Sequence, residues 1–199
     1  MPPRIQIRDL QTVLKDFEPM VKNPRFLRTG RRIPNFNLLP REAWGNWLLC
    51  VVMRHYFARD ITFAEGNEAD GVIHDRDTGF WFPTEHVCAL STPGAHAELR
   101  GEQRVIHAIQ QKIDRGPEYA RGKRLVVFIE DAGQWFPNRV GRLIHDTHHF
   151  DAVYVIGLES SVSDYIYSLT QLDGVQQNSL IWRITIDENF NNWNIVRVQ

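Results

Sequence analysis

Apolar residues repeat at helical spacing in three segments of the chain. The first segment predicts a helix over residues 9–22, opened by an aspartate that suits the N-cap. Pro40 suits the first turn of a second helix, which is expected to end near Tyr56. A third helix is predicted over residues 102–115. The repeating apolar positions are Leu10, Val13, Leu14 and Phe17 in the first helix, Trp44, Trp47, Leu48, Val51 and Val52 in the second, and Val105, Ile106, Ile109 and Ile113 in the third.

Other segments have the β-branched and aromatic residues that are typical of strands. Two of them, residues 125–129 and 153–156, are continuous apolar runs, as expected for strands covered on both faces. Strands are predicted over residues 61–64, 125–129, 153–156, 180–186 and 193–198, and further helices over residues 138–148 and 163–172. This order predicts an α/β protein, a three-layer domain with a central mixed β-sheet flanked by helices.

Residues 69–87 have the pattern of a β-hairpin, with turn-forming residues at 75–79. Centring the turn there places Asp70 opposite Glu85. Directly opposed side chains have Cβ atoms about 5 Å apart, where two like charges destabilise a sheet. The pair therefore needs a shared proton or a cation, and a hard divalent metal is the commonest answer. Pro83 leaves open a shift of register by one residue, and exposed carboxylates would then need no cation.

The composition is that of a soluble globular protein, with 43% hydrophobic and 24% charged residues and a net charge of −1. The 199 residues are expected to form a single domain, in which residues 1–39 supply a helix and a basic loop, 40–158 the core, and 159–199 a helix and a strand pair. No apolar run is long enough to span a membrane, and no signal-peptide apolar region is found. Cys50 and Cys88 lie in apolar runs, so reduced, buried thiols and a cytoplasmic location are expected.

The order of these features resembles the PD-(D/E)XK nuclease superfamily, which has the restriction-endonuclease-like fold. A predicted helix with an early acid, Glu42, is followed by a strand and by Ala69-Asp70-Gly71. The hairpin then leads to Thr84-Glu85-His86-Val87, a helix and a buried strand. The resemblance covers roughly residues 40–158, which would form the nuclease-like core, and it rests on order more than on individual letters.

This resemblance implies a metal-dependent nuclease. Asp70 and Glu85 would be the ligands of Mg²⁺ or Mn²⁺, and the backbone carbonyl of His86 would complete the coordination. Glu42 would match the helical acid that contributes in many members. Metal-activated water would hydrolyse a phosphodiester bond. The expected partner is nucleic acid, DNA before RNA, and a homodimer or a protein complex is left open.

One position departs from the family pattern, because Val87 stands where the family has a lysine. Glu85 and Val87 would point to the same face of a strand, whereas His86 would point to the other face and cannot substitute. Some members carry the lysine on another element. Lys112, one of four lysines in the chain, is the candidate for that role, since it could extend from its predicted helix toward the sheet. The alternatives are a solvated Lys112 and a catalytically inactive scaffold that serves as a binding or assembly module.

Residues 23–37 are predicted to form a loop with a basic cluster that could bind the substrate. Arginines suit phosphate oxygens, and the interleaved Phe26 and Phe36 suit unstacked bases. The alternative is a solvated loop that packs on an acidic surface of the protein itself. The candidate nucleic-acid-binding residues are Arg25, Arg28, Arg31 and Arg32.

A second candidate metal site lies near the end of the helix predicted over residues 138–148. His145 and His149 are four residues apart, which on a helix places two imidazoles on one face, as in zinc hydrolases. The run lacks the glutamate of the zinc-protease motif and an evident third ligand. Histidines also favour a helix C-terminus for electrostatic reasons, and this second interpretation is the favoured one.

Overall fold

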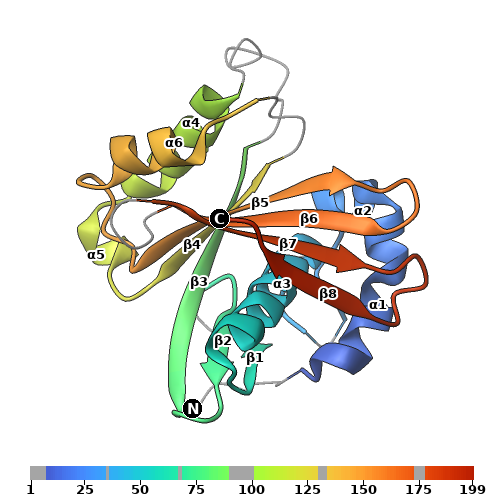
Figure 1. Cartoon of the computed structure of the whole chain (residues 1–199). Coiled ribbons are helices and arrows are strands. Elements are labelled where there is room, and N and C mark those ends of the chain that lie inside the picture. The colour runs from blue at the N-terminus through green and yellow to red at the C-terminus, as the bar shows by residue number, and fades with distance from the viewer. Residues whose placement is uncertain (1–7, 35, 67–68, 90–100, 130–133, 173–177) are drawn as a thin grey trace.

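The chain forms an α/β structure built on a mixed sheet. The computed structural model describes residues 8–34, 36–66, 69–89, 101–129, 134–172 and 178–199, and these contain six helices and eight strands (Figure 1). The helices are α1 (Leu10–Lys22), α2 (Pro24–Thr29), α3 (Pro40–Phe57), α4 (Glu102–Ile113), α5 (Pro117–Ala120) and α6 (Pro137–Ile144). The strands are β1 (Ile61–Ala64), β2 (Val72–Asp75), β3 (Phe80–Ala89), β4 (Arg124–Ile129), β5 (Ala152–Ser160), β6 (Tyr165–Gln171), β7 (Leu180–Ile186) and β8 (Trp193–Arg197).

All eight strands belong to one sheet, in which they follow the order of the chain from β1 to β8. Strands β3, β4 and β5 run parallel to one another, and every other pair of neighbours is antiparallel. A parallel pair requires a crossover connection, and the crossovers contain α4 and α5 after β3 and α6 after β4. The predicted mixed α/β sheet is therefore confirmed.

Helices lie against both faces of the central strands (Figure 1). Val126 and Phe128 of β4 pack in one cluster with α1 and α3, whereas Leu125 and Val127 pack in a second cluster with α4 and α6. Successive side chains of a strand point to opposite faces, so a strand covered on both faces must be apolar throughout. This explains the continuous apolar run that predicted β4.

Beyond β5 the sheet curls around α3 (Figure 1). The ring of Trp44 in α3 packs edge-on against Tyr167 of β6, with 5.6 Å between the ring centroids. Trp182 of β7 and Ile195 of β8 belong to the same buried cluster. Because the curled sheet surrounds it, α3 is buried on most of its circumference, from Pro40 to Met53.

The helix predicted over residues 163–172 is wrong, because this segment forms strand β6. The segment is rich in aromatic and β-branched residues, and its Tyr167 and Leu169 are buried against the α3 core. It pairs with β5 on one side and β7 on the other. Hydrogen bonds to these two strands stabilise the extended conformation of the segment. A local sequence pattern does not show which strands will be its neighbours.

Two other helical boundaries differ from the prediction. Part of the predicted loop 23–37 forms α2, because Pro24 stands at the first helical position and the side chain of Asn23 accepts a hydrogen bond from the Arg25 amide (3.3 Å). At the other end of the core, α6 ends at Ile144 instead of near residue 148.

Both cysteines are free thiols. Cys50 is buried, which raises the pKa of its thiol, and Cys88 is half-buried. Among the described residues, no helix combines the length and the apolar character that a membrane span requires.

Gly71 lies just before β2, where backbone geometry and space both demand glycine. Its φ is +145°, a conformation that side chains disfavour, and a Cβ atom there would lie 2.0 Å from Nδ2 of Asn46. Gly79, in the hairpin turn, has φ +74°, but a Cβ atom there would meet no described heavy atom within 4 Å. A side chain at Gly79 would therefore cause backbone strain alone, whereas a side chain at Gly71 would cause both strain and a steric collision.

We expect Gly71→Ala to lower the free energy of unfolding by about 3 kcal/mol, because strain and collision add. Gly79→Ala should cost about 1 kcal/mol from strain alone. Urea denaturation of the two variants and the wild type measures this difference. Equal losses in the two variants would contradict the packing of Gly71 against Asn46.

Candidate active site

The turn between β2 and β3 brings Asp70 and Glu85 close together. The paired residues of the two strands end at Val72 and Pro83. Beyond them Thr84 bonds to two residues: its carbonyl accepts from the Asp70 amide, and its amide donates to the Gly71 carbonyl, both at 2.9 Å. Two residues opposite one are the pattern of a β-bulge, so Asp70 is shifted by one residue from the simple register that would oppose it to Glu85. The two side chains are still neighbours, because Nζ of Lys112 lies 3.8 Å from Asp70 and 3.1 Å from Glu85.

The turn of the hairpin explains why this register is adopted. Asp75 is buried at the end of β2, and its Oδ1 accepts hydrogen bonds from the amides of Asp77 (3.1 Å) and Thr78 (3.2 Å). Arg59 pairs with the other carboxylate oxygen at 3.1 Å. A side chain that caps its own turn in this way sets the loop length, and the loop length sets the register.

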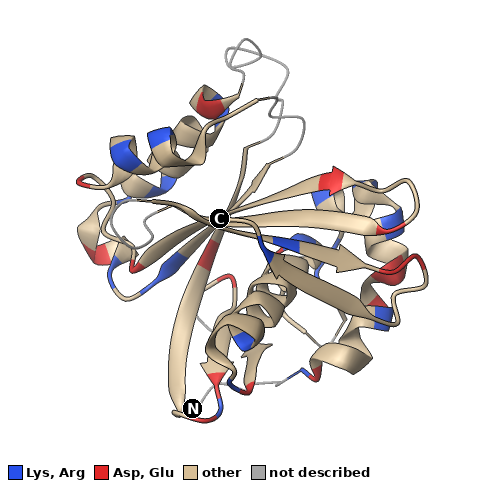
Figure 2. Cartoon of the chain, in the orientation of Figure 1, with Lys and Arg blue, Asp and Glu red and all other residues tan. Residues whose placement is uncertain are grey.

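Glu85 is a buried carboxylate with three donors around it. The residue is only 5% exposed. Its Oε1 accepts a hydrogen bond from Nζ of Lys123 at 2.9 Å, and its Oε2 accepts one from Nζ of Lys112 at 3.1 Å. The hydroxyl of Tyr119 also donates to Oε2. Two of the four lysines of the chain thus meet at one carboxylate (Figure 2 marks acidic and basic positions on the neighbouring strands β3 and β4).

These donors change the acid–base properties of the cluster. Burial alone would raise the pKa of Glu85, but the hydrogen bonds from Tyr119, Lys123 and Lys112 outweigh it and lower the pKa. For Tyr119, burial and the hydrogen bond to Glu85 raise the pKa. Glu85 is therefore ionised and Tyr119 is neutral at pH 7.

Lys112 joins the two neighbouring carboxylates. Its Nζ lies 3.1 Å from Glu85 and 3.8 Å from Asp70, and it also donates to the hydroxyl of Tyr119 at 3.1 Å. The lysine side chain is only 10% exposed. It extends from α4 over the sheet, so its ammonium group lies between the two carboxylates.

Val87 occupies the same face of β3 as Glu85. It packs against the cluster that includes Val105, Ile109 and Leu125. A lysine here would have to replace apolar contacts with α4. Val87 therefore occupies an apolar position on this face of the strand.

Asp70 is held by the backbone of the opposite strand. The amide of His86 donates to Asp70 Oδ2 at 2.9 Å. A residue in a strand points its N–H and C=O toward the same edge, so the His86 carbonyl lies on the edge that faces Asp70. The Asp70 side chain is 32% exposed, which leaves this side of the cluster open to solvent.

Asn46 of α3 connects the helix to both carboxylate-bearing segments. Its side-chain carbonyl accepts hydrogen bonds from the Thr84 hydroxyl (2.8 Å) and from His86 Nε2 (3.2 Å), and its amide donates to the Asp70 carbonyl (3.2 Å). Asn46 is completely buried. These bonds position the residues on either side of Glu85.

The side chain of His86 lies on the α3 face of the sheet, as predicted, and so cannot replace a lysine. Burial lowers its pKa well below the usual range, and the charges of Arg41 and Lys112 lower it further. Because the Asn46 oxygen only accepts, Nε2 must carry the proton. The other ring nitrogen, Nδ1, is buried without a hydrogen-bond partner among the described residues.

Glu42 stands in the first turn of α3, and its Oε2 accepts a hydrogen bond from the Leu39 amide at 2.8 Å. Burial raises the pKa of Glu42, and the nearby charge of Asp70 raises it further. The charges of Arg41 and Arg32 act in the opposite direction. Glu42 is thus electrostatically coupled to Asp70, on the side of the cluster away from α4.

Asp70, Glu85 and the His86 carbonyl supply oxygen atoms of the kind that Mg²⁺ prefers, and Mg²⁺ commonly binds through one or two carboxylates and keeps several waters. Both oxygens of Glu85 already accept hydrogen bonds, and the ammonium group of Lys112 lies between the two carboxylates. Within the described part of the chain, no group of three or more His, Cys, Asp and Glu side chains could hold a metal ion.

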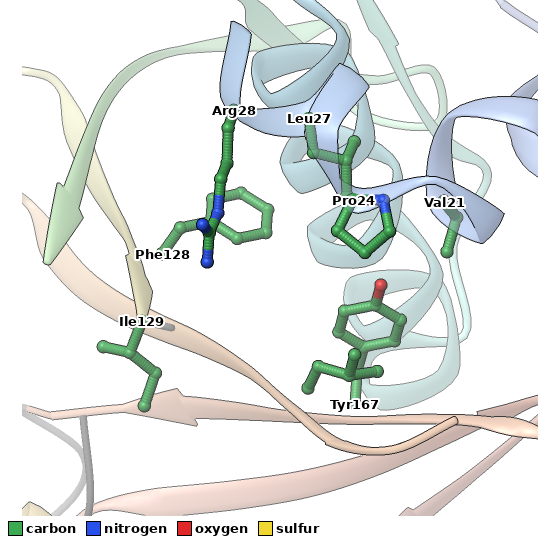
Figure 3. A pocket seen from close by; sticks show the side chains of 8 residues that line it. Val21, Pro24, Leu27, Arg28, Phe128, Ile129 and Tyr167 are labelled. Atoms are coloured by element: carbon green, nitrogen blue, oxygen red, sulfur yellow. The ribbon is translucent and has the colours of Figure 1, made fainter. Parts of the chain in front are cut away.

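The arginine cluster does not converge on these carboxylates. Arg28 of α2 lines a cavity of about 230 Å³ that Phe128 of β4 also lines (Figure 3). Phe128 belongs to the α3 face of the sheet, whereas Glu85 is bound from the α4 side. All four arginines are exposed, and the charge of Arg32 lowers the pKa of Glu42. Phe36 is buried and cannot stack on a base.

The histidine pair at the end of α6 does not share a helical face. The helix ends at Ile144, so the i, i+4 argument for His145 and His149 fails. Nδ1 of His145 lies 2.9 Å from the carboxylate of its neighbour Asp146. This arrangement is that of an exposed helix end.

Sequence reasoning missed Lys123 and Tyr119. Lys123 directly precedes β4, and the parallel register pairs Glu85 with Leu125, two residues further along. Lysine and leucine at alternate positions share a face, so the register would have identified Lys123. Tyr119 lies on the four-residue helix α5, which has no periodic pattern to predict it.

Comparisons of the chain with protein-family models, with curated proteins and with solved structures found no match.

The buried, neutral His86 predicts a pH dependence of stability. The unfolded chain takes up a proton at this residue below pH 6.5, but the folded chain does so only at much lower pH. The unfolded state therefore binds more protons, and stability falls as the pH is lowered. Below pH 6.5 the loss approaches about 1.4 kcal/mol per pH unit.

We expect His86→Gln to lose less stability than the wild type between pH 7 and pH 5. Denaturant titrations at several pH values in the presence of a chelator measure this. Parallel pH profiles for the two proteins would show that His86 is not buried in its neutral form.

Proposed function

We propose that this protein is a metal-dependent phosphodiester hydrolase that acts on nucleic acid. The observation that carries the proposal is the position of Lys112, whose ammonium group lies 3.1 Å from Glu85 and 3.8 Å from Asp70. Two neighbouring acids with a lysine between them are the side chains that the nuclease resemblance requires. The lysine comes from α4 instead of position 87.

The order of elements supports the same proposal. Helix α3 with Glu42 is followed by β1, by Asp70, by the hairpin with Glu85, by α4 and by the parallel strand β4. Two separate apolar clusters lie on the two faces of β4. We therefore propose a three-layer, restriction-endonuclease-like core, to which β6, β7 and β8 add a curled extension.

Asp70 and Glu85, with the carbonyl of His86, would hold Mg²⁺ or Mn²⁺. Such an ion, when bound, polarises a phosphate and lowers the pKa of a water molecule. Lys112 would stabilise negative charge that develops on the phosphate oxygens. The His86 amide orients Asp70, and Tyr119 orients Glu85. Glu42, with its raised pKa, is closer than an ordinary glutamate to the range in which a carboxylate accepts a proton at neutral pH.

A second candidate function is a binding or assembly module without catalysis, in a complex that processes nucleic acid. Val87 at the family's lysine position favours it, as does the complete neutralisation of Glu85 by two ammonium groups. The two candidates differ in one property: only the hydrolase requires a divalent cation at Asp70 and Glu85.

The decisive experiment combines Mn²⁺-dependent melting with a cleavage assay on DNA and RNA. We expect Mn²⁺ to raise the melting temperature of the wild type, and Asp70→Asn to abolish both this rise and cleavage. Lys112→Gln should lower kcat by about 100-fold, the usual cost of removing one charge-stabilising donor. Lys22→Gln removes an exposed lysine that pairs only with Glu18 among the described ion pairs, and it should retain full activity.

Cleavage that persists in both Asp70→Asn and Glu85→Gln would refute the hydrolase. Binding of nucleic acid without cleavage and without any effect of Mn²⁺ would instead support the assembly module.

A further inference from the structure

Two stacked aromatic rings lie exposed near the turn of the β2–β3 hairpin. The register places His74 directly across from Trp81, and their rings are 3.7 Å apart between centroids with an angle of 4° between the planes. Trp81 is 39% exposed, although tryptophan side chains are on average highly buried. The hairpin therefore presents a flat aromatic surface to solvent.

The arrangement of the strands leaves the outer face of the Trp81 ring without a neighbouring strand. On one side of the pair β1 continues the sheet, and Thr62 pairs with His74. On the other side β4 begins at Arg124, which pairs with Thr84, so in the described part of the chain residues 80–83 pair only with β2. The face of the indole that is turned away from His74 lies on this open side.

The aromatic pair shares a face of β3 with the charged cluster around Glu85. Trp81, Pro83 and Glu85 occupy alternate positions of the strand, so their side chains point to the same face. Phe82, between them, packs with the α3 cluster on the opposite face. Trp81 and Glu85 are about 13 Å apart along the strand at the usual rise per residue. A chain of a few nucleotides can follow this face from the aromatic pair to the cluster.

The cluster end of this face carries an exposed guanidinium group. Arg115 donates from Nη1 to the Tyr119 hydroxyl at 3.1 Å, and its guanidinium lies 4.9 Å from the centroid of the Tyr119 ring. The residue is exposed and has no carboxylate partner among the described ion pairs. Lys112 and Lys123 lie on the same tyrosine but are paired with Glu85. Arg115 is therefore the cation best placed to bind a phosphate oxygen.

We propose that Trp81 stacks on an unpaired base of a single-stranded nucleic acid whose backbone follows β3 toward Arg115. The proposal rests on the proposed function, because it takes nucleic acid as the partner, and it names single strands as the substrate class. Aromatic rings beside basic residues are the means by which proteins bind single strands. In a duplex each base is already stacked on its neighbours, so no base face is available to the indole.

The test measures binding of a fluorescein-labelled thymidine oligonucleotide of about 12 nucleotides by fluorescence anisotropy, in a chelator. Trp81→Ala should weaken binding about tenfold, the usual effect of losing one stacked base. Trp81→Phe keeps an aromatic ring and should stay within about threefold of the wild type. Phe80→Ala is the matched control, because Phe80 is 64% exposed and adjacent in the strand but points to the other face, and it should bind as the wild type does.

An abasic strand of the same length separates stacking from phosphate binding. The wild type should prefer the intact strand by about tenfold, whereas Trp81→Ala should bind the two strands within about twofold of each other. The comparison on the wild type needs no variant, so it holds even if Trp81→Ala perturbs the hairpin. Arg115→Gln should weaken both strands equally and reduce the dependence of log affinity on log salt concentration by about 0.7.

The outcomes separate this proposal from the function on which it rests. Wild-type protein that binds neither single strands nor duplex would overturn both. Protein that cuts duplex DNA in Mn²⁺, with equal single-strand affinity in the wild type and Trp81→Ala, would overturn the stacking site alone. An equal loss in Phe80→Ala and Trp81→Ala would also overturn it. Single-strand binding that depends on Trp81, without any cleavage, would support the stacking site and refute the hydrolase.

Discussion

The buried charge of Glu85 is the constraint on which the arrangement of the surrounding elements depends. An ionised carboxylate that is 5% exposed is stable only with partners, and removing a partner from a buried ion pair commonly costs about 3–5 kcal/mol. Its partners come from three places: Lys112 on α4, Tyr119 on α5 and Lys123 before β4. The side chain of Glu85 therefore connects the crossover between β3 and β4 to the sheet. Its contact with Lys112 also fixes the position of α4 relative to the hairpin.

The opposite face of β3 satisfies its polar groups in a different way. There Asn46 links Thr84, His86 and the Asp70 carbonyl by neutral hydrogen bonds, and Gly71 has no room for a side chain. Alternation along a single strand thus separates a charged cluster on the α4 side from a neutral network on the α3 side. The neutral network orients the strand, and this orientation fixes where the carboxylates lie.

Local patterns predicted much of this structure. The alternation and turn residues of the hairpin were enough to place Asp70 near Glu85, because turn length sets register over short distances, but they did not reveal the one-residue shift at Asp70 and Gly71. The helical stripe of α4 was enough to suggest that Lys112 reaches the sheet. Strand β6 and Lys123 were not predictable in this way. The first depends on pairing with β5 and β7, and the second depends on the parallel register of β3 and β4 across a long crossover.

The sequence by itself determined the identities of the two neighbouring acids, the absence of the lysine at Val87 and the alternation of strands and helices in the core. Only the tertiary structure decided which cations neutralise Glu85 and that the arginines of residues 25–32 do not converge on it. The physical reason is the separation along the chain between the residues that interact. Hydrogen-bonded turns and side-chain periodicity act over a few residues, whereas the ion pair between Glu85 and Lys123 joins residues 38 positions apart and exists only once the parallel strands have paired.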